Sequence, residues 1–337
     1  MELLSHSYSF PAWEGEISFD YRLDHNHKQD NIDPAVNGDG EETLPTGGVA
    51  EWGGDQAKHH PLPLRLTHHG GATLTGNIDL AILWYGLVPK LHRDRILSFI
   101  KSLNGSPPQP QPSVTAWWVM VESYQAFVRK PVGPIIVNVV SEVDDVRASL
   151  GKVLIKDFIW KLLPIATKGR PNTLVIIVAA EDVSVANMCA GKCAQHGNLD
   201  VNGRPQPFVL VGNPVNECPE CAWPFVSDIH NPRGMVLKPP SGNLAADAMV
   251  MSLAGGLLEA AINPFGDGFY GNMRGEDVEA FIACKGIFGS GSRRGDPGKH
   301  LIDPVTGGAY NVYGADNNKF LVPAIFNPKN NLCWTPL

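Results

Sequence analysis

A chain of 337 residues is long enough for one large domain or two medium ones. Its formal charge of −7 is unevenly placed, because residues 1–60 hold 12 acidic and 3 basic side chains while the remainder holds 22 and 24. The near-neutral remainder lacks the basic stripe of nucleic-acid-binding proteins, and no apolar run reaches the roughly 18 residues that a membrane span needs. The sequence therefore predicts neither a nucleic-acid partner nor a membrane span.

The first 62 residues form an acidic, polar leader. This leader contains short polar stretches such as His25-Asn26-His27 and little that could form a core. Residues 1–19 have neither a basic start nor an apolar stretch, so we do not expect a signal peptide. We predict a poorly ordered leader over 1–62 and a single folded domain over 63–337.

Strand and helix patterns alternate through the folded body. Strands are predicted at 76–86, 135–140, 173–179 and 208–211, helices at 93–103, after Ser113 and at 150–163, and short strands near 310–312 and 320–325. The segment 173–179 is continuously apolar, which is typical of a central strand covered on both faces. The alternation predicts an α/β layered domain with a mixed central sheet.

A further apolar helix is predicted from Met249 until Asn263-Pro264 ends it. Gly255 and Gly256 lie one turn before Glu259 and together cost this helix roughly 2 kcal/mol relative to alanine. Zinc hydrolases place a His and a Glu at such positions, with another ligand one turn later on the same helix face. A lost metal site or close backbone packing would explain the glycines. We expect the lost metal site, in which case Gly256→Ala stabilises the chain. With close backbone packing, the same substitution would be destabilising.

Other side chains are weaker candidates for chemistry. Asp182 follows the central strand, where α/β proteins often place site residues, but it also suits a turn cap. His69 lies beside two glycines and is either a ligand or a loop histidine. Trp117 and Trp118 would offer a platform for stacking sugars, or one ring would lie in the core and the other at the surface. No phosphate-binding loop, nucleophile elbow or dinucleotide-binding fingerprint appears in a strand–turn–helix context.

Six cysteines complete the set of candidate residues. Four of them form C-x3-C and C-x2-C motifs separated by 24 residues, and the six are Cys189, Cys193, Cys218, Cys221, Cys284 and Cys333. The four clustered thiols suit a structural zinc site or disulfides equally well. The even number of cysteines favours three disulfides.

Several segments together resemble the plant phosphate-induced protein 1 family, also called exordium and exordium-like proteins. The resemblance covers about residues 65–337 and includes the order and approximate spacing of all six cysteines. The segments that carry it are HGGATLTGNIDLAILWYG at 69–86, SVTAWWVMVESY at 113–124, residues 174–193 ending in MCAGKC, CPECAWPF at 218–225, NP at 263–264, CKGIFG at 284–289 and GAYNV at 308–312. The leader does not share the resemblance.

The resemblance implies a secreted protein of the plant cell wall space, or apoplast. Members of this family are associated with growth and with brassinosteroid or phosphate responses, and no enzymatic activity is established for them as a class. An extracellular localisation is therefore expected, although no signal peptide is visible in this chain. The expected partner is an unknown cell-wall or extracellular molecule, with a glycan as one option.

The usual family members also resemble zincins, which implies a zincin-like helix arrangement. They carry His-Glu-x-x-Glu before the Asn-Pro and Glu-x-x-Asp before the following cysteine. In this chain these five positions are Gly255, Gly256, Glu259, Glu279 and Ile282. Three of the five have lost a ligating side chain, so the resemblance implies a degenerate site without a catalytic metal or other cofactor.

The sequence thus predicts a non-catalytic exordium-like protein, or pseudoenzyme, that acts through binding. One alternative is a metal-dependent hydrolase that uses Glu259 and Glu279 with a rebuilt ligand such as His69 or Asp182. Another is a cell-wall glycan-binding module that presents Trp117, Trp118 or Trp223.

The disulfide connectivity is a separate prediction. We expect the pairs Cys189–Cys193, Cys218–Cys221 and Cys284–Cys333, among the 15 connectivities that six cysteines allow.

Overall fold

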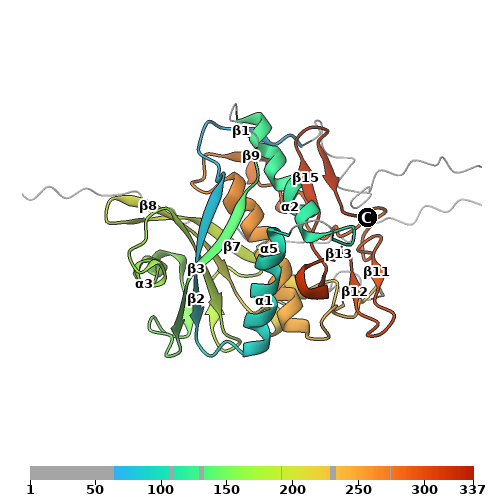
Figure 1. Cartoon of the computed structure of the whole chain (residues 1–337), viewed down its shortest axis with the longest axis horizontal. Coiled ribbons are helices and arrows are strands. Elements are labelled where there is room, and N and C mark those ends of the chain that lie inside the picture. Colours follow the sequence, from blue (N-terminus) through green and yellow to red (C-terminus); the bar gives the residue numbers. More distant parts are fainter. Residues whose placement is uncertain (1–63, 106–108, 129–132, 191, 228–232, 274) are drawn as a thin grey trace, which may run out of the picture. The chain divides into compact units, whose positions relative to one another are not determined.

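The computed structural model describes residues 64–105, 109–128, 133–190, 192–227, 233–273 and 275–337. The predicted leader over 1–62 lies outside the described residues. The described part of the chain is an α/β fold built on a mixed sheet (Figure 1).

The central sheet has five strands in the order β3-β2-β5-β8-β7. Their bounds are Asn77–Tyr85 (β2), Ile136–Asp145 (β3), Thr173–Ala179 (β5), Ala194–Val201 (β7) and Arg204–Val211 (β8). Four strands are parallel, and β7 runs antiparallel to β8 at one edge, which confirms the predicted mixed sheet. All seven residues of β5 are buried, because this central strand is covered on both faces.

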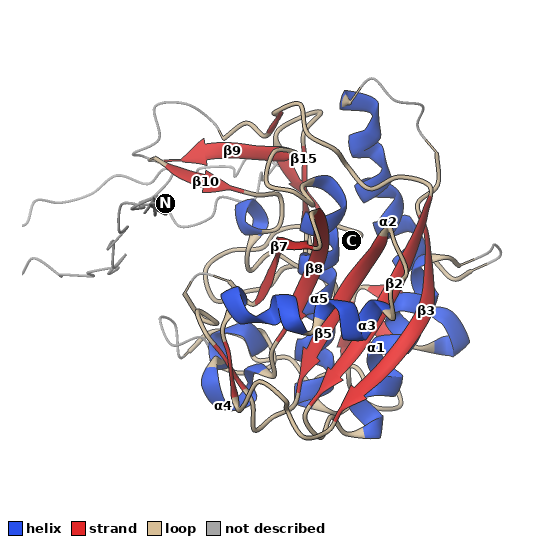
Figure 2. Cartoon of the chain, turned by 90° about the vertical axis from the view of Figure 1, so that its left-hand side faces the viewer, coloured by secondary structure: helices blue, strands red, loops and turns tan. Residues whose placement is uncertain are grey.

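Helices cover both faces of the sheet. Helix α3 (Leu163–Thr167) lies on one face, and α1 (Lys90–Leu103), α2 (Val114–Glu122) and α5 (Leu244–Ile262) lie on the other (Figures 1 and 2). Ser113 caps α2 as the sequence predicts, because its side-chain oxygen accepts a hydrogen bond from the backbone N–H of Ala116 at 3.1 Å. The zincin-like arrangement of helices stays a prediction.

Helix α5 runs through the core, and every residue from Ala246 to Ile262 is buried. A helix that is apolar on all sides is stable only when protein or lipid surrounds it. By length and composition α5 could cross a membrane, which the shorter apolar run in the sequence does not indicate, but 94% of the relevant window is buried inside the fold. It also begins five residues earlier than the sequence pattern indicates, at an Asn243 side chain that accepts a hydrogen bond from Ala246 N at 2.8 Å.

One local prediction from the sequence is wrong, and one strand was not predicted. The segment 150–163 is not one helix but a 3-10 helix, η3 (Lys156–Lys161), followed by α3. Pro164 lies in the first turn of α3, where its ring is tolerated, whereas an α-helix continuing past it would lose a hydrogen bond and clash. Strand β7 is missing from the predicted elements because its sequence, AQHGNLDV, lacks an apolar run.

The remaining described elements are short. They are β1 (Thr67–His68), η2 (Ser123–Phe127), β4 (Val153–Leu154), β6 (Ser184–Val185), α4 (Pro214–Glu217), η4 (Pro219–Ala222), β9 (Phe269–Met273), β10 (Glu276–Val278), η5 (Ile282–Cys284), β11 (Leu301–Ile302), β12 (Ala309–Tyr310), β13 (Val312–Tyr313), η6 (Ala315–Asn317), β14 (Lys319–Phe320), β15 (Ile325–Asn327) and β16 (Leu332–Trp334).

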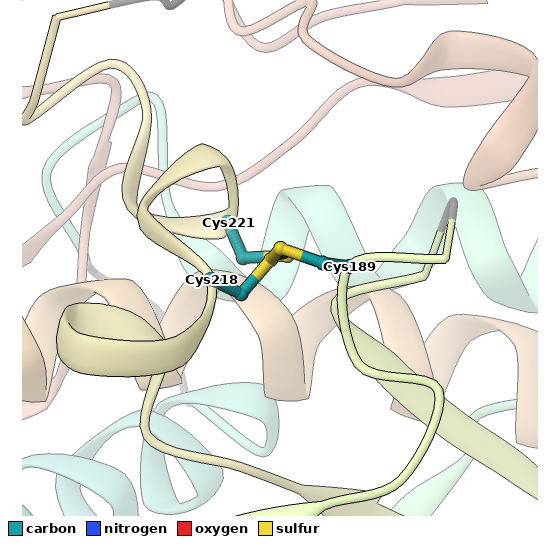
Figure 3. Close-up of side chains that lie close together, drawn as sticks. All are labelled: Cys189, Cys218 and Cys221. Carbon is teal, nitrogen blue, oxygen red and sulfur yellow. Dashed lines mark hydrogen bonds between the residues drawn. A yellow bond between two sulfur atoms is a disulfide. The ribbon is translucent and has the colours of Figure 1, made fainter. Parts of the chain in front are cut away.

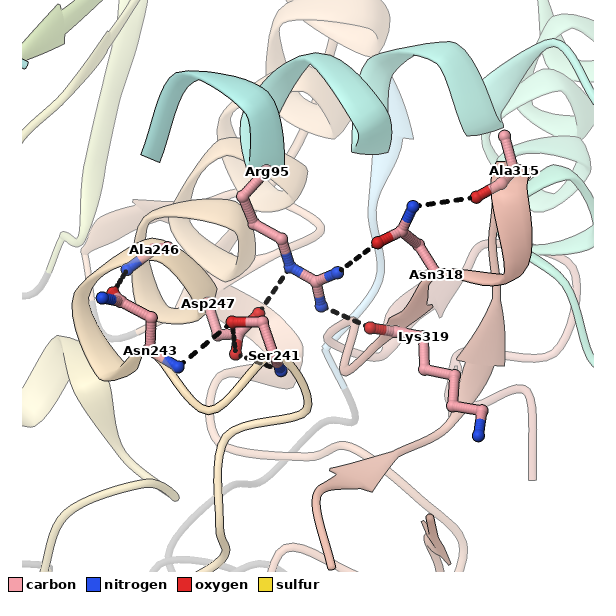
Figure 4. A network of polar contacts seen from close by, with 8 residues as sticks. All are labelled: Arg95, Ser241, Asn243, Ala246, Asp247, Ala315, Asn318 and Lys319. Carbon is pink, nitrogen blue, oxygen red and sulfur yellow. Dashed lines mark hydrogen bonds and ion pairs between the residues drawn. The ribbon is translucent and has the colours of Figure 1, made fainter. Parts of the chain in front are cut away.

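A buried ion pair joins α1 to α5 (Figure 4). Arg95 Nε donates to Asp247 Oδ1 at 2.7 Å, and both side chains are less than a tenth exposed. The second carboxylate oxygen of Asp247 accepts hydrogen bonds from the backbone N and Oγ of Ser241 at 2.8 and 2.7 Å. The guanidinium also donates to Asn318 Oδ1 at 3.1 Å and to the backbone oxygen of Lys319. We call this ion pair the Arg95–Asp247 clamp.

The six cysteines form three disulfides. The predicted pair Cys284–Cys333 is confirmed, with Cα atoms 5.7 Å apart. The predicted pairs within the two short motifs are wrong, because Cys189 bonds Cys218 and Cys193 bonds Cys221. The two motifs face each other from different loops, with Cα–Cα distances of 5.4 and 5.3 Å across them (Figure 3). Since all six sulfurs are bonded, none is left as a thiolate for zinc.

Candidate functional site

Two glutamates indicated by the sequence meet a histidine that the sequence analysis missed. His196 Nε2 lies 2.9 Å from Glu279 Oε2 and 3.7 Å from Glu259 Oε2. The three side chains are 6%, 11% and 3% exposed, respectively. We call these three residues the buried triad.

Three different elements bring the buried triad together. His196 lies on the edge strand β7 opposite Val209 of β8, and Glu259 lies on α5, which packs against both strands. Glu279 follows directly after β10. The sequence separates these residues widely, so only the packing of α5 on the sheet places the imidazole beside the carboxylates.

Asn263, which ends α5, holds Glu279 in place. Its backbone N–H donates to the carbonyl of Glu259 at 2.8 Å, and its side-chain Nδ2 donates to Glu279 Oε1 at 2.5 Å. Its Oδ1 accepts from the backbone N–H of Gly268 at 2.7 Å. The Asn-Pro helix stop therefore also orients one carboxylate of the triad.

The electrostatics of the buried triad are strongly coupled. Burial and the charge of Glu279 raise the pKa of Glu259 to about 7, although the charge of His196 opposes this. Burial raises the pKa of Glu279, but the hydrogen bond and charge of His196 outweigh it, so that this pKa is lowered overall. Burial lowers the pKa of His196, but the hydrogen bond to Glu279 and the two carboxylate charges raise it overall. The imidazole and the two carboxyl groups therefore titrate as one coupled system and share protons among them.

The triad also offers the donor set of a metal site. One imidazole nitrogen and two carboxylate oxygens lie within 4.8 Å of one another. Glu259 Oε1 and His196 Nδ1 are buried and have no hydrogen-bond partner among the described residues. Histidine nitrogen and carboxylate oxygen are common ligands of Zn²⁺, so these residues fit a divalent cation.

The two glycines before Glu259 are closed off by neighbouring side chains. A Cβ atom on Gly255 would lie 2.7 Å from Cδ1 of Phe281, and one on Gly256 would lie 2.6 Å from Cγ1 of Val209 and 3.1 Å from Cβ of Ala194. The geometry thus supports the close-packing alternative for Gly256→Ala and not the stabilising effect that we expect from the sequence. Ile282, at the third altered position, is half-buried and packs against the core.

The other candidates from the sequence lie elsewhere. Asp182 is exposed and pairs with Lys152 at 2.5 Å, and His69 is exposed and stacks on Tyr270 with ring centroids 3.6 Å apart. No contact in the described part of the chain joins Asp182 or His69 to the triad. The described structure therefore does not bring either residue to the triad.

The tryptophan pair that could form a platform for stacking sugars does not lie at the surface. Trp117 and Trp118 are both buried, and their indole N–H groups donate to the backbone oxygens of Pro323 and Ile135 at 2.8 and 2.9 Å. Trp223 is half-buried and packs against Phe288. A hollow of about 280 Å³ lies beside the start of α2 and is lined by Gln109, Ser113 and Thr115 among others, away from the triad.

Several known plant proteins are similar to this chain. The phosphate-induced protein 1 conserved region matches residues 66–336. Protein EXORDIUM of Arabidopsis thaliana is 35% identical over 281 residues, which cover 80% of this chain and 88% of that protein. Protein EXORDIUM-like 1 of the same plant is 34% identical over 277 residues, and Protein PHOSPHATE-INDUCED 1 of Nicotiana tabacum is 33% identical over 278 residues. These alignments cover 80% of this chain and 89% and 88% of the two relatives. No solved structure matches.

Proposed function

Since the chain belongs to the phosphate-induced protein 1 family, we propose that this exordium-like plant protein is non-catalytic and acts by binding in growth control at the cell wall. The name of the tobacco relative, PHOSPHATE-INDUCED 1, supports a role in the response to phosphate. A hormone response such as that to brassinosteroid belongs to the same proposal. The partner is an extracellular or cell-wall molecule.

One observation carries the non-catalytic part of this proposal. A metal hydrolase needs a coordination position that is open to water and substrate. Here Phe281 closes over Gly255 and Val209 over Gly256, while the Glu259 side chain is only 3% exposed. A substrate carbonyl has no access to the carboxylates in this packing.

The three disulfides support the proposed extracellular location. Three disulfides that use every cysteine fit an oxidising compartment and are rare in the cytosol. A fluorescent fusion of the native gene product should therefore remain with the wall after plasmolysis, and retention of the fusion in the cytoplasm would contradict this part of the proposal.

A genetic rescue tests the function itself. A plant line that lacks the protein should regain normal growth with the wild-type gene and equally with Glu259→Gln, because a buried carboxamide preserves the volume but not the chemistry of a carboxylate. Rescue by wild type alone, with both proteins present in equal amount, would favour the hydrolase. Purified protein supplied with zinc should likewise cleave no casein above the rate of heat-denatured protein.

A further inference from the structure

We infer that His196, Glu259 and Glu279 form a closed site for one divalent transition-metal ion of the zinc class, which serves the fold and not a reaction. This inference rests on the proposed non-catalytic function, because a closed site supplies no position for substrate. It assigns a ligand to residues that come from a strand, a helix and a loop.

The donor chemistry is the first argument. A neutral imidazole suits zinc and its neighbours in the periodic table, and carboxylate oxygens complete many such sites. One ring nitrogen of His196 and one carboxylate oxygen of each glutamate lie within 4.8 Å of one another.

The spacing of the donors is the second argument. Ligand atoms in a tetrahedral zinc site, at about 2.0–2.1 Å from the metal, lie about 3.4 Å apart. The two distances from His196 Nε2, 2.9 and 3.7 Å, lie within about 0.5 Å of that spacing. Small side-chain movements would therefore exchange the hydrogen bond for metal coordination.

The charge balance is the third argument. Two buried carboxylates cost several kcal/mol each unless positive charge compensates them. One divalent cation neutralises both while the imidazole stays neutral. It would also bind Glu259 Oε1, which is buried and has no hydrogen-bond partner among the described residues. With both oxygens of Glu259, the metal would have the four protein donors of a closed zinc site.

The support around the triad is the fourth argument. Metal-binding carboxylates are usually held by further hydrogen bonds, and these orient the ligand. Asn263 Nδ2 donates to Glu279 Oε1 at 2.5 Å and leaves Oε2 directed at His196. Asn263 is itself fixed by Gly268 N at 2.7 Å, so one ligand is positioned before any metal arrives.

The test uses the full chain with its disulfides intact, stripped by a chelator and given ZnCl₂ alone. We expect about one zinc per chain by elemental analysis, and zinc at about 100 times its Kd should raise Tm by roughly 5 °C. His196→Gln and Glu279→Gln should each lower bound zinc at least tenfold. His300→Gln serves as the matched control, because His300 is half-buried and its Nδ1 makes a hydrogen bond with the backbone oxygen of Gly298.

Each outcome decides a different point. Absence of bound zinc and of any Tm shift in the folded wild-type chain overturns the inference and leaves the non-catalytic function standing. Full zinc binding by folded Glu279→Gln, with circular dichroism like wild type, also overturns it. Zinc binding at the triad together with casein cleavage supports the site but overturns the proposed function.

Discussion

Gly256 lies where helix α5 packs tightly against Val209 of strand β8. Because Val209 is β-branched and lies on a central strand, it has few other rotamers, and an alanine methyl at 2.6 Å forces the helix or the strand to shift. We expect Gly256→Ala to lower the free energy of unfolding by roughly 1–3 kcal/mol, which exceeds the gain in helix propensity. A urea midpoint, with the m-value held equal, measures the change.

The control for Gly256 is a double-mutant cycle with Val209→Ala. Truncating Val209 makes room for the new methyl group, so the two substitutions together should cost less than the sum of their separate effects. Additive losses, or a Gly256→Ala variant more stable than wild type, would show that the glycine is a relic of a lost ligand and not a packing residue.

The buried triad predicts a pH dependence for the metal-free chain. The folded pKa of Glu259, about 7, lies above its ordinary value of 4.5, and the pKa of His196 is also raised, so both groups bind protons more tightly when folded. Their contribution to stability is present below the unfolded pKa values and is lost as the pH rises through the folded ones. Glu279 acts in the opposite sense, but its lowered pKa confines its effect to more acidic solutions.

We therefore expect the Tm of the chelator-treated chain to fall between pH 5 and pH 8. Glu259→Gln mimics the protonated carboxyl group, so it should flatten this fall. Thermal unfolding followed by circular dichroism at several pH values measures both proteins. An unchanged slope in Glu259→Gln would assign the pH dependence to other groups.

At the scale of secondary-structure elements, the Arg95–Asp247 clamp fixes α1 on α5. Because every polar atom of Asp247 is bonded and the pair is buried, removing Arg95 leaves an uncompensated carboxylate in the core. We expect Arg95→Ala to cost about 3–5 kcal/mol. The exposed pair Lys101–Asp316 is the matched control, and Lys101→Ala should cost less than about 1 kcal/mol. Equal losses in denaturant titrations would mean that the clamp contributes no more than a surface ion pair.

The disulfides make a second prediction at this scale. Peptide mapping without reductant should recover Cys189 linked to Cys218 and Cys193 linked to Cys221. The third disulfide, Cys284–Cys333, closes a separation of 49 residues, so replacing both cysteines by serine should cost roughly 4 kcal/mol in the chain-entropy model. Recovery of the pairs within each short motif would contradict this connectivity.

Sequence patterns predict elements well where the pattern is local and strong. The apolar run Thr173–Ala179 is the central strand with the predicted bounds, and Ser113 caps α2. Strand β7 could not be predicted in the same way, because its pairing with β8 and its cover by α5 are tertiary effects that no periodicity reports. The candidate site shares this limit, since Glu259 and Glu279 follow from a family motif but His196 lies on β7.

The same limit explains why the pairing of the four clustered cysteines could not be predicted. Spacing along the chain identifies two short motifs but not that they face each other from different loops. One sequence signal could have drawn attention to His196, which lies three residues after Cys193. The disulfide of Cys193 ties this part of the chain to a neighbouring loop and so places nearby side chains inside the fold.

For the whole molecule, the family match and the described core coincide. The match covers residues 66–336, and all three disulfides and the main hydrophobic cluster lie within that range. We expect a chain of residues 64–337 to fold alone, with a Tm within about 2 °C of the full chain. In a domain of this length, a change of about 1 kcal/mol in the free energy of unfolding shifts Tm by only a few degrees. Aggregation of the shortened chain, or a much lower Tm in calorimetry, would show that residues before 64 contribute to the fold.

Helix α5 has a consequence for biosynthesis. All five strands of the central sheet end by Val211, so a ribosome completes the sheet sequence before Leu244 is made. For the extracellular location that we propose, the chain would pass through a protein-export channel. Such a channel releases segments of 19 apolar residues sideways into lipid unless polar groups oppose this, and Asp247 and Glu259 would each make such release costly. The two carboxylates that the folded protein holds in its interior would thus also keep the nascent helix out of the bilayer until the sheet can receive it.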